Sequence, residues 1–146
     1  AYNNRGIAWR LKGDDARALE DFDQALRLRP GDVDALYNRG LALTGLRQYD
    51  RAIAEFDSTL RLQPDDIDAV VSRGMAWLHK GDSGRALQDF DRALGARPGN
   101  AIALYGRGIA RRRTGNQKGG DADIAAAKAI QADIGEQFAT MGLSAS

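Results

Sequence analysis

Apolar residues recur at helical spacing in blocks that are separated by short polar breaks. In residues 33–46, Leu36, Leu43 and Leu46 share one side of a helix, and residues 49–62 repeat this with Ile53, Phe56 and Leu60. The breaks read KGD at 12–14, LRQ at 46–48, KGD at 80–82 and TGN at 114–116. The second block ends before a proline, because the residue preceding proline is pushed out of the α region. The pattern predicts pairs of helices joined by short turns.

Several residue types return every 34 residues, which is typical of stacked supersecondary units. The positions that keep this step are Arg5-Gly6, Arg39-Gly40, Arg73-Gly74 and Arg107-Gly108, then Ala18, Ala52 and Ala86, Phe22, Phe56 and Phe90, and Pro30, Pro64 and Pro98. We therefore predict a single domain over residues 1–146. Its repeats would cover about 1–32, 33–66, 67–100 and 101–134, followed by a capping helix over about 133–143.

A glycine inside each first helix needs a reason, because it costs roughly 1 kcal/mol relative to alanine. We expect Gly6, Gly40, Gly74 and Gly108 to let two helix backbones approach closely. The recurring alanines of the second helices, Ala18, Ala52 and Ala86, would be their small partners. The glycine is thus predicted to serve packing.

The arginine before each glycine lies near a buried seam and therefore needs a partner. The second helices offer a carboxylate at the same step, and Asp23, Asp57 and Asp91 follow two residues later. We predict a structural ladder in each repeat, between Arg5, Arg39, Arg73 and Arg107 and the row Asp21, Glu55, Asp89 and Asp123. Nucleic-acid contact is the alternative use of a periodic arginine, but the matched acidic row favours the ladder.

These residues together make the chain resemble the tetratricopeptide repeat family over about residues 1–134. The family pattern, W-x2-L-G-x2-Y, then A-x3-F, then P, is matched by Tyr2, Gly6, Trp9, Ala18, Phe22 and Pro30 and their equivalents. An arginine replaces the leucine of the pattern. The fourth repeat departs from the pattern at Arg111, Gly120, Ile124 and Ala132, as terminal repeats do. The resemblance implies an all-α, right-handed α-solenoid of antiparallel helix pairs.

The resemblance also implies that the first helix of each pair lines a concave groove that binds a peptide or a helix. The predicted groove residues are Tyr37, Leu41, Val71, Met75, Leu78, His79, Tyr105, Ile109, Arg112 and Arg113, and a wider set on the same face includes Asn3, Ile7, Arg10, Asp34, Thr44, Asp68 and Ile102. Many of these side chains are apolar, as at partner sites. In the alternative interpretation, Ile7, Leu41, Met75 and Ile109 form core between neighbouring first helices.

One familiar ligand of the family, the C-terminal carboxylate of Hsp70 or Hsp90, does not fit this sequence. That clamp needs lysine, asparagine and arginine where this chain has Asn3, Ile7, Asn38, Asp68 and Ser72. Only Asn38 agrees, and Asp68 would repel a carboxylate. We expect this chain not to be a chaperone-tail clamp.

Composition and charge limit the kinds of functional site that the chain can form. The 146 residues carry a net charge of +1, no cysteine and one histidine, His79. We therefore expect no thiolate metal site, cofactor or catalytic centre, and no apolar run is long enough for a membrane span. Residues 105–120 hold five basic side chains and no acidic one, so they either dock an acidic group or form a solvated terminal helix. The acidic pairs at 14–15 and 65–66 suit helix N-termini.

The sequence thus predicts a non-catalytic scaffold for protein–protein interaction that takes a peptide or helix of a partner in its groove. The alternative is self-assembly into a homo-oligomer through the terminal repeats, since the first repeat would expose Tyr2 and Trp9. An accessory domain of an enzyme is a third interpretation. Because Ala1 falls inside a predicted helix, we expect a fragment or a processed form of a soluble protein whose compartment stays open.

Overall fold

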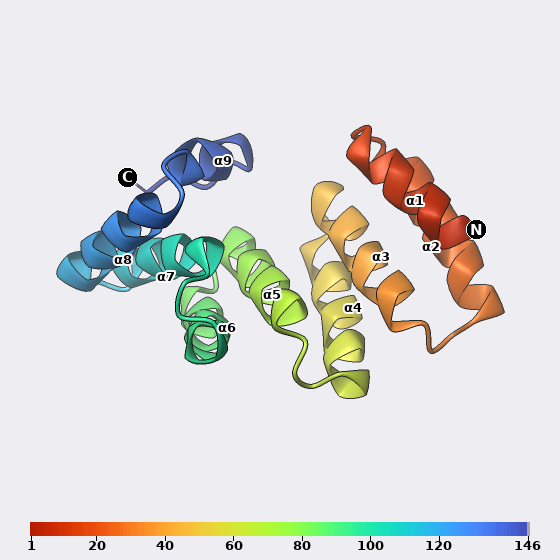
Figure 1. Cartoon of the computed structure of the whole chain (residues 1–146), viewed down its shortest axis with the longest axis horizontal. Coiled ribbons are helices and arrows are strands. Elements are labelled where there is room, and N and C mark those ends of the chain that lie inside the picture. The colour runs from red at the N-terminus through yellow and green to blue at the C-terminus, as the bar shows by residue number, and fades with distance from the viewer. Residues whose placement is uncertain (146) are drawn as a thin grey trace. The chain divides into compact units, whose positions relative to one another are not determined.

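The computed structural model describes residues 1–145, and these residues form nine α-helices and no β-strand (Figure 1). The all-α fold of antiparallel helix pairs predicted from the sequence is confirmed. The helices group into two compact units, residues 1–76 and residues 77–146. The single domain over the whole chain stays a prediction. Within the described part of the chain, no helix is both long enough and apolar enough to cross a membrane.

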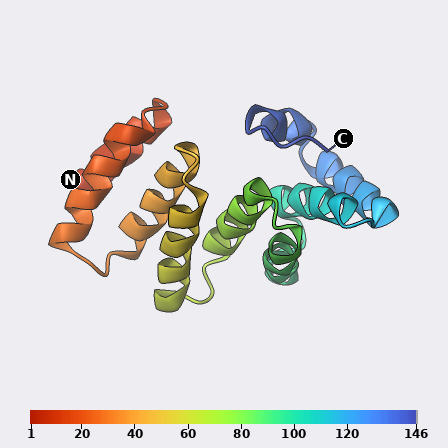
Figure 2. The same cartoon turned by 180° about the vertical axis from the view of Figure 1, so that it is seen from behind.

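The first unit holds two complete repeats and the beginning of a third. Its helices are α1 (Tyr2–Leu11), α2 (Asp15–Leu28), α3 (Val33–Gly45), α4 (Tyr49–Leu62) and the first part of α5 (Ile67–Lys80). In both views α1 lies along α2 and α3 lies along α4, and α3 also packs against α2 (Figures 1 and 2). The predicted helix over 33–46 ends one residue earlier than expected, and the one over 49–62 has the expected bounds.

The second unit begins near the end of α5 and contains α6 (Ser83–Ala96), α7 (Ala101–Arg113), α8 (Gln117–Ile130) and α9 (Ile134–Thr140). The decayed fourth repeat still folds as the helix pair α7 and α8. The short helix α9 packs against both of them, with Ile134 and Phe138 fully buried and the Phe138 ring 4.5 Å from that of Tyr105, centroid to centroid. The predicted capping helix over 133–143 corresponds to α9.

The recurring glycine faces an aromatic ring rather than an alanine, which corrects the packing expected from the sequence. A methyl group added at Gly6 would stand 2.6 Å from Phe22 Cε1, and one added at Gly40 would stand 2.5 Å from Phe56 Cε1. Both rings are fully buried. The glycine therefore makes room for the phenylalanine of the second helix in the same repeat.

Close backbone approach, as expected from the sequence, is found in the fourth repeat. There Ile124 replaces phenylalanine and Gly120 replaces alanine, and a methyl group added at Gly108 would stand 2.9 Å from the Gly120 carbonyl oxygen. The smaller side chains allow α7 and α8 to come together at this point.

Helix caps and turns follow the same step along the chain. The carboxylate of Asp14 accepts from the Arg17 N–H at 3.1 Å and that of Asp66 accepts from the Ala69 N–H at 3.1 Å, which confirms the capping role predicted for these acidic pairs. The turns inside the first, third and fourth repeats place a glycine at positive φ. In the second repeat the equivalent residue is Arg47, which has a φ of 61°.

Candidate functional site

Three of the recurring arginines hold the carboxylate on the second helix of the same repeat through two hydrogen bonds. Arg5 donates to Asp21 at 2.8 and 2.7 Å, Arg39 to Glu55 at 3.0 and 2.9 Å, and Arg107 to Asp123 at 2.9 and 2.9 Å. The hydrogen bond from Arg5 lowers the pKa of the Asp21 carboxyl, against an opposing effect of burial. Arg73 and Asp89 belong to different units, and for them the pair stays a prediction.

The remaining nitrogen of the arginine binds the helix of the preceding repeat, which the sequence analysis did not predict. Arg39 Nη1 donates to Asp23 at 3.1 Å, Arg73 Nη1 to Asp57 at 2.9 Å and Arg107 Nη1 to Asp91 at 3.0 Å. These aspartates follow the row of the predicted ladder by two residues and were given no partner of their own. Arg39 and Arg107 therefore each join three helices, one of them from the neighbouring repeat.

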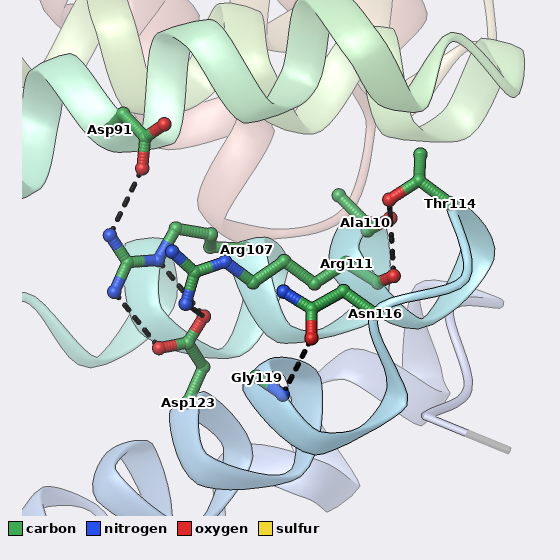
Figure 3. Close-up of polar contacts among 8 residues, drawn as sticks. All are labelled: Asp91, Arg107, Ala110, Arg111, Thr114, Asn116, Gly119 and Asp123. Atoms are coloured by element: carbon green, nitrogen blue, oxygen red, sulfur yellow. Dashed lines mark hydrogen bonds and ion pairs between the residues drawn. The ribbon is translucent and has the colours of Figure 1, made fainter.

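All four arginines of the basic stretch at 105–120 are engaged inside the second unit, and Figure 3 shows two of them, Arg107 and Arg111. Arg107 and Arg111 converge on Asp123, with Arg111 Nη1 at 2.9 Å from Asp123 Oδ2. Arg112 donates through Nε to Asp121 at 2.7 Å and also contacts the carbonyl oxygen of Ala145, and Arg113 donates to the carbonyl oxygen of Leu78 at 3.0 Å. These internal acceptors favour a structural role for the stretch over the docking of an acidic group.

The first helices of unit 1 present a surface that mixes apolar and polar side chains. We call it the first-helix face, and its members are half-buried: Asn3, Ile7, Tyr37, Asn38 and Leu41. Ile7 packs against the cluster of Ala18, Phe22 and Ala42, while Tyr37 and Leu41 pack against that of Leu43, Ala52 and Phe56. Each apolar member thus rests on the core and keeps part of its surface exposed.

Polar contacts hold the first-helix face in register across three helices. Asn38 Nδ2 donates to Asn3 Oδ1 at 3.4 Å, between α3 and α1. The Tyr37 hydroxyl lies 3.1 Å from Ser72 Oγ on α5, and burial raises the pKa of this phenol. The Tyr37 ring also lies on the core, 5.8 Å from the Phe56 ring between centroids. The Tyr37 side chain is therefore held at its hydroxyl by Ser72 and at its ring by Phe56.

The predicted groove residues differ in exposure. Tyr37, Leu41, His79 and Arg112 are half-buried and Arg113 is exposed. The other five are buried in this structure, with Leu78 wholly inaccessible: Val71, Met75, Leu78, Tyr105 and Ile109. For Met75 and Ile109 this agrees with the alternative interpretation of the aliphatic row as core. Among residues 1–145, no three His, Cys, Asp or Glu side chains come together where they could hold a metal ion.

The helix pairs and their periodic contacts define an α-helical repeat protein, a class whose stacked units form extended binding surfaces. Models of the tetratricopeptide repeat match residues 1–33, 12–67, 37–101 and 78–135. The chain belongs to the tetratricopeptide repeat family. Folds of this family typically serve as non-catalytic modules for protein interaction. A comparison with curated protein sequences gives no match.

Solved structures of similar fold cover most of the chain. MamA from Desulfovibrio magneticus RS-1, from its residue 41 to the end, is 26% identical with a TM-score of 0.83, over 97% of this chain and 80% of that one. TTC0263, a tetratricopeptide repeat protein from Thermus thermophilus, is 20% identical with a TM-score of 0.80, over 97% and 81% of the two chains. YrrB, a tetratricopeptide repeat protein with an unusual peptide-binding site, is 21% identical with a TM-score of 0.76, over 97% and 73%.

Proposed function

We propose that this protein is a scaffold that binds a peptide or a helix of a partner protein on the first-helix face of unit 1. The observation that carries the proposal is that this face combines apolar and polar side chains, each of them partly exposed. Ile7 and Leu41 offer aliphatic surface, Tyr37 offers a ring, and Asn3 and Asn38 offer amides that can pair with a peptide backbone. Such a face can hold a peptide by apolar contact and fix its register by hydrogen bonds.

The proposal is narrower than the groove predicted from the sequence. The buried members of that groove support the helix stack and leave Tyr37 and Leu41 as its accessible anchors. Arg112 and Arg113 have internal partners, so an acidic flank on the ligand is not part of the proposal. A tyrosine suits such a site, because it joins an apolar ring to a polar tip.

The test is a selection of peptides from a random displayed library on the native chain, followed by affinity measurements on variants. We expect Leu41→Asp to weaken the selected peptides at least about ten-fold, since a buried apolar contact is replaced by an unpaired charge. Asn38→Ala should weaken them less. Ala54→Asp is the matched control, because Ala54 is exposed on α4 and away from the first helices.

Circular dichroism on each variant separates lost binding from lost folding. The proposal fails if no peptide is selected, or if a folded Leu41→Asp variant binds the selected peptides as the native chain does.

A further inference from the structure

Arg10 lies beside the first-helix face of unit 1, and its guanidinium is incompletely bonded. It follows Ile7 by one turn of α1, so the two side chains emerge on the same side of the helix. Its Nε is buried and has no hydrogen-bond partner among residues 1–145. Its ion pair with Asp15 on α2 is long, because 3.8 Å separates Arg10 Nε from Asp15 Oδ1, which exceeds hydrogen-bond distance. The side chain is 27% exposed, so a ligand can reach it.

The Asp15 carboxylate is held by a contact with α3 as well. A methyl group added at Gly45 would clash with Asp15 Oδ2, so this oxygen lies against the end of α3. Because Asp15 contacts both helices, Arg10 lies on the side of α1 that faces α3. Burial raises the pKa of the Asp15 carboxyl, and the charge of Arg10 offsets this only in part. Asp15 is therefore a weak partner that leaves Arg10 able to bind a second carboxylate.

The fourth repeat shows how an arginine at this position is completed. Arg112 follows Arg10 by three steps of 34 residues, and its Nε donates to Asp121 on α8 at 2.7 Å. In the first repeat the residue equivalent to Asp121 is Leu19. Leu19 packs against the core cluster that contains Leu43 and cannot accept a hydrogen bond. The first repeat therefore has the arginine of this pair without its carboxylate.

The charge of Arg10 acts on the first-helix face itself. Burial raises the pKa of the Tyr37 phenol, and the charges of Asp68 and Asp66 raise it further. The hydrogen bond with Ser72 and the charge of Arg10 act in the opposite direction. The phenol is thus within electrostatic reach of a positive charge on α1 and of negative charges at the start of α5. An acidic group of a ligand is attracted to the α1 side of this face and repelled from the α5 side.

We propose that the peptide bound on the first-helix face carries an aspartate or glutamate whose side chain pairs with Arg10. This inference rests on the function proposed above and names the chemistry of its ligand, and the arginines of the fourth repeat have no part in it. Arginine can hold a carboxylate through two parallel hydrogen bonds, while neighbouring residues of the peptide contact Ile7 and Tyr37. Because the missing acceptor is a side-chain carboxylate, the acidic group is a side chain of the peptide and not its C-terminus.

The experiment selects peptides from a random displayed library on the native chain and, in parallel, on Arg10→Glu. We expect the native chain to select peptides that share an aspartate or glutamate, and Arg10→Glu to select peptides with lysine or arginine instead. Affinities are then measured on synthetic, end-blocked copies of the peptides selected by the native chain. Replacing the shared acidic residue by its amide should weaken binding about ten-fold, and so should Arg10→Gln. The two changes together should weaken it no further, because they remove the same ion pair.

Arg27→Glu is the matched control, because it makes the same change of charge at an exposed position on α2. It should bind the selected peptides as the native chain does. Circular dichroism checks the fold, and Arg10→Gln with the amide peptide decides the result if Arg10→Glu does not fold.

The inference is overturned if the selected peptides are lost with Leu41→Asp but share no acidic residue, or bind Arg10→Gln with native affinity. That result leaves the proposed function standing, whereas a library that yields no peptide overturns both. Binding that requires a free C-terminal carboxylate on the peptide would also overturn the inference.

Discussion

At the scale of single residues, the repeat is organised around side chains that fill or leave space for their neighbours. Gly40 leaves space for the ring of Phe56, and the arginine beside it spreads its nitrogens over carboxylates of two other helices. Arg39 and Gly40 are adjacent, so one turn of α3 combines a gap for an aromatic ring with a polar link between helices. This explains why the two residues recur together.

We predict that Gly40→Ala destabilises the chain by up to about 2 kcal/mol. Overpacking against the fully buried Phe56 ring costs about 1–3 kcal/mol, and the better helix propensity of alanine returns about 1 kcal/mol of it. Urea unfolding followed by circular dichroism measures the difference. Gly95→Ala is the control, because a methyl group there meets open space and should stabilise the helix. Equal effects of the two changes would contradict the packing role.

Arg47 is the one described residue other than glycine with a positive φ, at 61°. The left-handed conformation costs an L-residue roughly 1–2 kcal/mol, whereas glycine adopts it freely. Arg47→Gly should therefore raise the free energy of unfolding by about 1 kcal/mol. Arg51→Gly, inside α4, should lower it by a similar amount, and thermal unfolding of both variants checks the opposite signs. A loss of stability in Arg47→Gly would show that its side chain contributes more than its backbone costs.

The pKa of Asp21 predicts how the first repeat responds to acid. The hydrogen bond from Arg5 holds this pKa below the ordinary value of about 3.9, so the folded state binds fewer protons than the unfolded state. The stability that this carboxylate contributes is present above pH ~3.9 and is lost as the pH falls through the folded-state pKa. Urea unfolding of the native chain and of Asp21→Asn should differ most at neutral pH and converge in acid. A difference that does not change with pH would contradict this role of the ion pair.

At the scale of helices, Arg39 makes two links of unequal strength to neighbouring helices. Glu55 binds Arg39 through two hydrogen bonds and its side chain is 16% exposed, whereas Asp23 receives one bond and is 40% exposed. The stronger link therefore lies within a repeat and the weaker one between repeats. This difference separates the stability of a helix pair from the stability of the stack.

We expect Glu55→Ala to cost about 2–3 kcal/mol, since it leaves a partly buried guanidinium without its bidentate partner. Asp23→Ala should cost at most about 1 kcal/mol, as exposed ion pairs do. Urea unfolding of both variants and of their combination with Arg39→Ala measures each coupling energy. A larger coupling for Asp23 than for Glu55 would reverse the assignment of strong and weak links.

Sequence periodicity predicts the helices better than it predicts their contacts. The bounds of α4 and the cap at Asp14 follow from the spacing of prolines, polar breaks and acidic residues. Periodicity identifies equivalent positions but not which neighbour each side chain reaches. Phe22 and Ala18 recur with the same step, and only the three-dimensional packing shows that the ring of Phe22 faces Gly6. For the same reason the sequence shows that Leu78 recurs among apolar residues but does not show that its side chain is fully buried.

At the scale of the molecule, the chain forms two compact units, and within each unit the helices chiefly contact their neighbours in sequence. Stability in such a protein is approximately a sum over repeats and the interfaces between adjacent repeats. A change inside one unit should therefore act mainly on the helices of that unit. The short helix α9 offers a direct test, because its contacts lie on α7 and α8.

Phe138→Ala removes a fully buried ring that packs on Tyr105, and such a loss costs about 3–5 kcal/mol. We expect amide hydrogen exchange to accelerate in α7 and α8, because α9 no longer covers them, and to stay unchanged in α1 to α4. Met141→Ala is the control, since Met141 is 38% exposed and its loss should change stability by less than about 0.5 kcal/mol. Equal acceleration in α1 to α4 would instead mean that the two units unfold as one cooperative structure.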